Sequence, residues 1–228
     1  MQYLGGKWSM RGIIAPAVTS HGLPVFEPFT GGANLADLWP KGSVCSDIDR
    51  DNVRLYAHVQ ANGVGWIPDD GEIPKPRYLE ALARMRSNDA TLLDTFYLLA
   101  CSFRGKKGAG YAAPHPAQKR VSQGRNGLKL LQGIPVTFAA LDFFEVEPRP
   151  GFALYCDPPY RASTGYRAQG NDSFDHSRFD ARAREWAKLA PVYVTEYAAR
   201  EGWLEVGSKR PTPGRLTTKT DRLFRVLP

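Results

Sequence analysis

Residues 24–48 read "PVFEPFTGGANLADLWPKGSVCSDI", and their pattern indicates the class of fold. The runs 24–29 and 43–48 are short, apolar and β-prone, while 34–39 between them has the pattern of a short helix that ends at Pro40. A longer helix is predicted over 49–62, because apolar side chains recur there at helical spacing. Strands that alternate with helices in this way predict a largely parallel α/β sheet.

The remaining chain continues the alternation. Helices are predicted over 90–103, with Asn88 or Asp89 as the N-cap, and over 176–190, with Asp175 as the N-cap. Further strands are predicted at 135–146, 152–156, 191–197, 202–207 and 221–227.

Composition describes an ordinary globular protein. The chain has 228 residues and a mean hydropathy of −0.38, which suits one well-cored domain with a small insert. No apolar run is long enough to span a bilayer, so no membrane partner is expected. Cys45, Cys101 and Cys156 lie far apart without metal-ligand spacing, which predicts no metal site and a reducing, cytoplasmic location.

Positive charge is concentrated in one segment. The formal net charge is +7, and residues 95–141 contain no Asp or Glu. We call residues 95–141 the acid-free segment. Its glycines favour flexibility, and its aromatic residues alternate with cations, which suits binding to a phosphate backbone and bases, although a solvated loop is the alternative. The candidate DNA contacts are Arg104, Lys106, Lys107, Lys119, Arg120 and Arg125. Lys129 is the seventh cation.

The sequence "CDPPY" at 156–160 follows the apolar run 152–155. A proline turn that stops a strand explains Pro158 and Pro159, but it does not require Asp157 or Tyr160. Methylation of an exocyclic amine needs acceptors for the amine hydrogens, because the nitrogen lone pair is delocalised into the base. Asp157 and the Pro158 carbonyl could accept those hydrogens, and Tyr160 could stack on a base that has left the duplex.

Other conspicuous residues also follow predicted strands, where ligands bind in open α/β sheets. Gly31 and Gly32 permit a close approach of backbone to a ligand, or form a structural turn. Asp47 could bind ribose hydroxyls, or cap a helix. Asp142 and Phe143 follow a third strand, or form a β-turn. The spacing does not match GxGxxG, which disfavours a nicotinamide site.

With these motifs the chain resembles the DNA adenine-N6 methyltransferases of the α type, the Dam-like family. The resemblance covers nearly the whole chain and keeps the order of the family's motifs. The matching stretches are "YLGGK" (3–7), "EPFTGGANL" (27–35), "SDIDRDNVRLY" (46–56), "LDFF" (141–144), "CDPPY" (156–160) and "FDHSRFDARAREWAKLA" (174–190).

The resemblance implies a Rossmann-like sheet, with helices on both faces, that binds S-adenosylmethionine. It also implies that the partner is double-stranded DNA. It implies a catalytic domain of residues 1–62 and 134–228, with 63–133 inserted as a target-recognition segment. Asp157, Pro158, Pro159 and Tyr160 would be catalytic. The cofactor would contact Tyr3, Lys7, Phe29, Gly31, Gly32, Asp47, Asp142, Phe143 and Asp157.

Departures from the family pattern leave the target open. The acid-free segment lacks the asparagine-arginine pattern usual in enzymes that read GATC, and Thr195-Glu196 stand where Ser-Asn is common. The short insert suggests a short or loosely read target, as in phage-encoded or orphan methylases, and any restriction endonuclease partner is unknown. The alternatives are methylation of another amine (cytosine N4, RNA adenine or a glutamine side chain) and an inactive DNA-binding relative.

Overall fold

The computed structural model describes residues 6–68, 73–113, 119–161, 174–210 and 219–228. Tyr3 lies outside these residues, and so does the side chain of Arg104. The chain divides into two compact units. Unit 1 comprises Met1–Gly6, Gly31–Asp37 and Asp49–Ile134, and unit 2 comprises Lys7–Thr30, Leu38–Ile48 and Pro135–Pro228.

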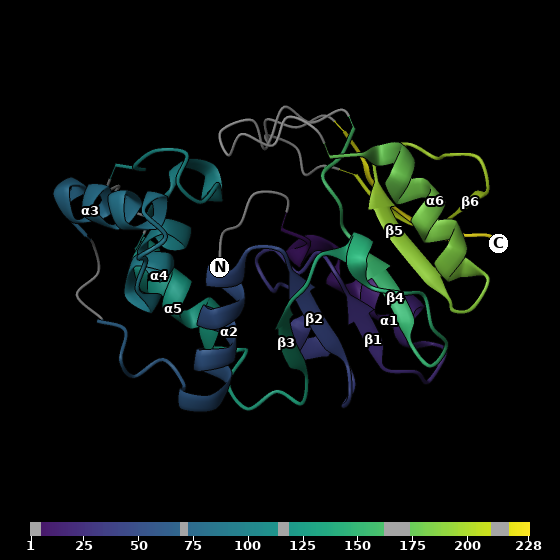
Figure 1. The fold of residues 1–228 in the computed structure, drawn as a ribbon, viewed down its shortest axis with the longest axis horizontal. Helices are drawn as coiled ribbons and strands as arrows, with labels where there is room; N and C mark the ends of the chain where they lie inside the picture. The colour runs from purple at the N-terminus through teal and green to yellow at the C-terminus, as the bar shows by residue number, and fades with distance from the viewer. Residues whose placement is uncertain (1–5, 69–72, 114–118, 162–173, 211–218) are drawn as a thin grey trace. The chain divides into compact units, whose positions relative to one another are not determined.

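Unit 2 contains a sheet whose described strands run in the order β3-β2-β1-β4-β5-β7-β6 (Figure 1). The first five strands of this order are parallel, and β7 runs antiparallel to both β5 and β6. The strands are β1 (Val25–Glu27), β2 (Val44–Asp47), β3 (Thr137–Ala140), β4 (Ala153–Cys156), β5 (Val192–Glu196), β6 (Trp203–Lys209) and β7 (Asp221–Val226). This arrangement confirms the predicted Rossmann-like α/β fold.

Helices cover both faces of this sheet. Helix α1 (Arg11–Thr19) contacts β4 and β6, and α6 (His176–Ala187) contacts β5 and β7, on opposite sides of the sheet in Figure 1. The carboxylate of Asp175 accepts the backbone N–H of Arg178 at 2.9 Å, which confirms the predicted N-cap. Helix α6 buries Phe179, Ala183 and Trp186, one side of the helix, against the sheet.

Several predicted elements are shorter or begin elsewhere. The run 34–39 forms only a 3-10 helix, η2 (Ala36–Leu38), and the strand predicted at 135–146 ends at Ala140, before the 3-10 helix η4 (Phe143–Glu145). Helix α4 (Leu92–Cys101) is not capped by Asn88 or Asp89. Its cap is Thr91, which exchanges hydrogen bonds with Asp94 in a capping box.

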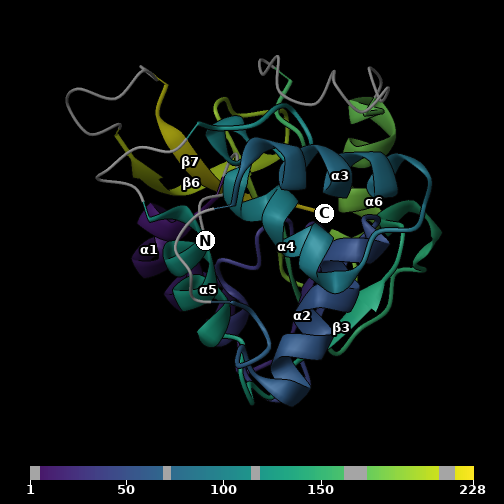
Figure 2. The ribbon, with the colours of Figure 1, turned by 90° about the vertical axis from the view of Figure 1, so that its left-hand side faces the viewer.

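Unit 1 is helical in its described part. Figure 2 shows its helices, with α4 between α3 and α2. They are α2 (Arg50–Asn62), α3 (Lys75–Arg86), α4 and α5 (Arg120–Lys129). Helix α4 contacts the other three, and every residue from Asp94 to Cys101 is buried. The helix predicted over 49–62 is confirmed, with Asp49 as its N-cap and Gly63 as its C-cap.

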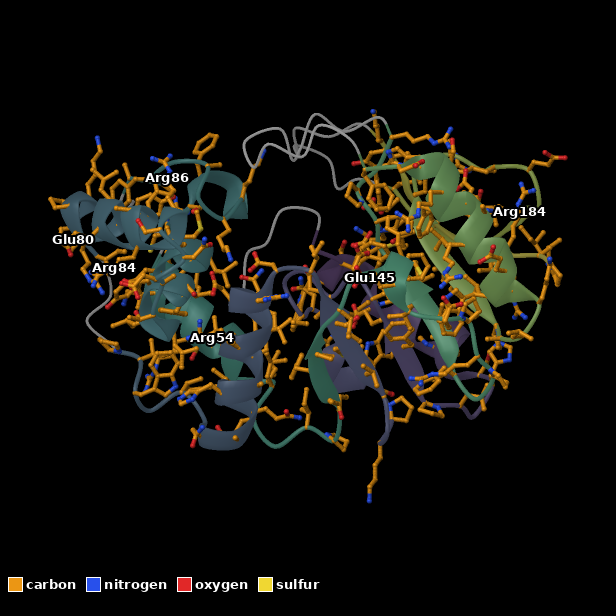
Figure 3. The ribbon with its side chains drawn as sticks, viewed as in Figure 1. Arg54, Glu80, Arg84, Arg86, Glu145 and Arg184 are labelled. Carbon is orange, nitrogen blue, oxygen red and sulfur yellow. The ribbon has the colours of Figure 1, made fainter. Side chains whose placement is uncertain are left out.

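Ion pairs also connect helices α3 and α4. The carboxylate of Asp94 is fully buried and pairs with Arg77 at 3.0 Å and Arg84 at 3.3 Å. Figure 3 shows Arg84 beside Glu80 on α3, where the two side chains form a further ion pair of 3.5 Å. Burial alone would raise the pKa of Asp94, but hydrogen bonds from Thr91 and the two guanidinium groups lower it overall.

The described part of the acid-free segment contains more helix than its glycine content predicts. Helix α5 lies within it and includes Gly124. A Cβ on Gly124 would lie 3.1 Å from the Cβ of Ala100 and 3.2 Å from the ring of Phe96, so this glycine permits α5 to approach α4 closely. Unit 1 also includes α2, and the assignment of 63–133 as a target-recognition segment stays a prediction.

Candidate active site

The parallel strands of unit 2 all end at one edge of the sheet. The strand order reverses between β1 and β4, since β2 and β3 follow on one side and β5 on the other. In sheets of this kind ligands bind at the carboxyl ends of the strands beside such a reversal. Asp157 follows β4 directly and Asp47 ends β2, so the fold brings both predicted acids to this edge.

Asp157 is held by two side chains. The ammonium of Lys7 lies 2.8 Å from its Oδ2, and the hydroxyl of Thr195 donates to its Oδ1 at 2.7 Å. Lys7 is only 6% exposed and Asp157 is 19% exposed, so this is a largely buried ion pair. Each carboxylate oxygen has two lone pairs, so Asp157 can still accept a hydrogen from a ligand.

Tyr160 lies among polar and aromatic side chains. The Nζ of Lys7 is 4.8 Å from the centre of its ring, and the ring of Tyr197 stands perpendicular to it, with centroids 4.5 Å apart. Its hydroxyl donates to Asp221 at 3.5 Å, a long contact. Burial, with the nearby charge of Asp157, raises the pKa of Tyr160 well above its ordinary value, so the phenol is neutral at physiological pH.

Sequence reasoning missed Glu27, the last residue of β1. Its carboxylate is buried and accepts the indole N–H of Trp39 at 2.6 Å, with the Sγ of Cys45 at 3.6 Å. Burial raises the pKa of Glu27 to about 8, against the hydrogen bonds that lower it. The available signal was an acid at the end of a short, otherwise apolar strand. Glu27 therefore lies beside the strand-end acids as a largely neutral group.

The acids after β2 and β3 differ in their surroundings. Asp47 is partly exposed, and its successor Ile48 is 67% exposed. Asp142 caps η4 by accepting the N–H of Phe144 at 2.9 Å. Ile48 was missed at the sequence level, although an apolar residue directly after a strand-end acid was a visible signal.

The two predicted phenylalanines belong to an aromatic cluster. Phe143 is 2% exposed, and its ring centroid lies 5.3 Å from that of Phe29 and 5.6 Å from that of Phe179. The ring of Phe143 therefore contributes to the core of unit 2. Because this ring is buried, it does not offer an open face to a ligand.

The glycine motif has the backbone conformation that its sequence suggests. Gly31 has φ +49°, in the left-handed region, and its carbonyl accepts the hydroxyl of Tyr56 at 2.7 Å. Ala33 has φ +51°, which is uncommon for a residue with a Cβ.

The cations of the acid-free segment are not equivalent. Lys119 is exposed, and Lys106 and Arg120 are partly exposed. Lys107 differs, because its ammonium is buried, 2.6 Å from Asp49 and 3.0 Å from the amide oxygen of Asn52. Lys107 therefore ties its loop to the start of α2 and is a poor candidate for a phosphate contact.

Arg125, also in this segment, is partly buried, and its Nε donates to the carbonyl of Val64 at 3.3 Å.

Among the residues that the structure describes, no group of three or more metal-ligating side chains occurs. No helix in the described ranges is long and apolar enough to cross a membrane.

Fold and site together define a Rossmann-like α/β protein with acidic residues at the carboxyl ends of its central strands. No protein-family model matches the chain, and no curated protein matches it. Among solved structures it is similar to yhhF, a candidate methyltransferase from Escherichia coli, with 12% identity, 96% of this chain and 85% of that chain covered, and a TM-score of 0.41.

Two further structures show a similar degree of likeness. One is the rRNA methyltransferase aviRa from Streptomyces viridochromogenes, with 14% identity, 96% of this chain and 83% of that chain covered, and a TM-score of 0.39. The other is HI0767, a candidate methylase from Haemophilus influenzae, with 13% identity and a TM-score of 0.38. The match covers 97% of this chain and 96% of that chain. Likeness this distant decides neither activity nor substrate.

Proposed function

We propose that this protein transfers a methyl group from S-adenosylmethionine to the N6 amine of adenine in DNA. One observation carries the proposal: the Asp-Pro-Pro-Tyr sequence directly follows β4, beside the reversal of strand order, with the Asp157 carboxylate held by Lys7 and Thr195. A turn that only stopped a strand would not need an acid held in this way. The candidate alternatives are another amine as acceptor and an inactive DNA-binding relative.

The residues at the strand ends suit this cofactor. A carboxylate at the end of β2 can accept ribose hydroxyls, and Asp47 is placed there, while exposed Ile48 can contact one face of an adenine ring. An ammonium carries three donors, so the contact of Lys7 with Asp157 is compatible with binding the cofactor's carboxylate as well. Phe143 suits this role less well, because its ring is packed in the core.

When bound, S-adenosylmethionine supplies an electrophilic methyl group on its sulfonium. Asp157 and the Pro158 carbonyl would accept hydrogen bonds from the two hydrogens of the target amine and draw its lone pair out of conjugation with the base. The nitrogen would form its bond to the methyl group as the bond from that methyl to sulfur breaks, and the amine would release one proton, to Asp157 or to water. Tyr160 would stack on the extruded adenine, an arrangement that rigid prolines can hold at fixed geometry. Electrostatic partners placed before the reaction stabilise the transition state without reorganisation.

Transfer of labelled methyl groups tests the activity. Genomic DNA and total RNA are each incubated with the protein and labelled S-adenosylmethionine, then digested to nucleosides and analysed by mass spectrometry. N6-methyladenine in DNA supports the proposal. N4-methylcytosine, or label only in RNA, would replace it with an alternative acceptor. No transfer to either nucleic acid would leave a glutamine side chain as acceptor, or the inactive relative.

The second part of the proposal is that the acid-free segment contacts DNA. Each phosphate contact contributes about −0.9 to the slope of log affinity against log salt. Replacing Lys106, Lys119 and Arg120 by alanine should therefore flatten the slope by about two to three units, with unchanged cofactor affinity. The matched control replaces three exposed lysines outside the segment: Lys41, Lys188 and Lys209. Equal slopes in both triple variants would show that the acid-free segment makes no DNA contacts and is a solvated loop.

We also propose that residues of the acid-free segment recognise the DNA bases of the target sequence. Arginine can pair two acceptors on guanine, so Arg104 and Arg125 are proposed as base readers. Replacing either should change which sites are methylated more than it changes DNA affinity, as measured by sequencing of modified adenines in context.

A further inference from the structure

Two residues at the end of β5 contact the loop that follows β4. Thr195 contacts the start of this loop and Glu196 contacts its end. Thr195 is fully buried and donates its hydroxyl hydrogen to Asp157 at 2.7 Å. Its oxygen lies 3.1 Å from the hydroxyl of Tyr155, and since threonine has one hydroxyl hydrogen, Tyr155 donates to it. A buried chain of hydrogen bonds therefore orients the carboxylate of Asp157.

The next residue, Glu196, binds the other end of the loop. It is 4% exposed, and its Oε2 accepts the backbone N–H of Arg161, the residue after Tyr160, at 3.3 Å. Its Oε1 accepts the N–H of Tyr197 at 2.7 Å. Glu196 thereby couples the backbone on one side of Tyr160 to Tyr197, whose ring stands against that of Tyr160.

Two guanidinium groups and a second carboxylate complete this arrangement. Arg200 lies 3.2 Å from Glu196 and also pairs with Asp180 of α6. The guanidinium of Arg161 pairs with the same Asp180 at 3.1 Å. Arg161 is therefore held through both its main chain and its side chain, and the buried charge of Glu196 is compensated.

We propose that Thr195 and Glu196 are positioning residues that hold the loop Asp157–Arg161 in the geometry required for transfer. The proposal rests on the function proposed above. Thr195 sets the direction of the Asp157 carboxylate, and Glu196 sets the backbone that carries Tyr160. A misplacement of about 1 Å at a reacting centre can cost about 100-fold in rate, so small losses of order in this loop should be measurable.

Hydrogen exchange tests the role of Glu196 without any need for activity. A glutamine has one acceptor oxygen and no charge, so Glu196→Gln loses at least one backbone contact and the ion pair with Arg200. We expect the amide hydrogens of Arg161 and Tyr197, followed by NMR, to exchange about tenfold faster or more. The matched control is Glu205→Gln, which breaks the more exposed 2.5 Å ion pair with Arg222. Unchanged exchange at both amides would overturn the role of Glu196.

Kinetics test the role of Thr195. Thr195→Val keeps the shape but loses the hydroxyl, so kcat should fall about 10- to 100-fold with little change in KM for the cofactor, while Thr195→Ser should restore kcat. The valine leaves Tyr155 without its acceptor, so the double variant Tyr155→Phe/Thr195→Val is used if the single variant unfolds. Wild-type kcat in a folded valine variant would overturn the role of Thr195.

The two proposals fail in different ways. If the wild-type protein transfers no methyl group to nucleic acid, the proposed function is wrong. The exchange measurement then still decides whether Glu196 holds the loop. If methyl transfer is found but neither exchange in Glu196→Gln nor kcat in Thr195→Val changes, the function stands and the positioning role is wrong.

Discussion

Replacing Asp157 by alanine should change stability as well as activity. The variant removes the carboxylate 2.8 Å from the ammonium of Lys7, which is 6% exposed. Removing one partner of a buried pair is strongly destabilising, typically by about 3–5 kcal/mol, because the other charge stays desolvated. A loss of activity alone would therefore not separate a chemical role for Asp157 from a structural one.

Two features of the site place the expected cost at or below the lower end of that range. Asp157 is 19% exposed, so water screens part of the interaction. Lys7 also lowers the pKa of Asp221, against the larger effect of burial, so a second carboxylate still interacts with the ammonium. We expect Asp157→Ala to lower the free energy of unfolding by about 2–3 kcal/mol. In a chain of this size that corresponds to a fall of about 4–12 °C in Tm.

The assay is thermal and urea unfolding followed by tryptophan fluorescence. Four of the five tryptophans, at 8, 39, 186 and 203, lie in unit 2, so this signal reports mainly on the unit that contains Asp157. The variants are Asp157→Ala, Lys7→Met and the double variant. The double variant should recover about 1.5–3 kcal/mol relative to the sum of the singles.

Additive effects of the two substitutions, or an unchanged Tm in Asp157→Ala, would refute this reasoning. Activity is compared well below the lowest Tm of the set. There the loss of one amine acceptor should still reduce kcat by about 10²–10³.

Three further predictions concern other parts of the molecule. Asp47→Ala should weaken S-adenosylmethionine binding by about tenfold or more in calorimetry, since it removes a charge-assisted hydrogen bond, and an unchanged affinity would remove Asp47 from the site. Glu27→Gln tests the pKa of about 8. Because the folded pKa lies above the ordinary glutamate value of 4.5, the folded state keeps a proton that the unfolded chain releases, so wild-type stability should fall relative to the variant by about 1 kcal/mol per pH unit between pH 5 and 8. Parallel stability curves would contradict this. Gly124→Ala should lower stability by about 1–3 kcal/mol through overpacking, whereas Gly12→Ala in α1, with no atom within 4 Å of the new Cβ, should be neutral or stabilising in the same unfolding assay.

Local signals in the sequence predicted much of the fold. Asp175 was recognisable as a cap because an N-cap acts over three residues, and the strands of the sheet were short apolar runs bounded by turns. Asp47 was considered as a cap for the next helix, but the cap of α2 is Asp49. The cap of α4 was assigned wrongly. Thr91 and Asp94 formed a capping box in the sequence, but Asn88 and Asp89 offered side chains of the same type a few residues earlier.

The candidate site could be predicted only in part, because some of its contacts join residues that are far apart along the chain. Asp47 and Asp157 follow apolar runs, and the carboxyl ends of parallel strands meet at one edge, so both were predicted to lie there. The partners of Asp157 could not be predicted, because Lys7 and Thr195 are 150 and 38 positions away along the chain.

Local patterns in the sequence were enough to predict the alternation of strands and helices, the residues that follow the strands, and the concentration of positive charge in residues 95–141. These features depend on neighbours along the chain. Three features became visible only in the folded chain: Glu27 is largely neutral, Lys107 is bound to Asp49, and the end of β5 contacts the loop after β4. Each of these depends on burial or on contacts between distant segments, and desolvation and ion pairing are set by what packs around a charge.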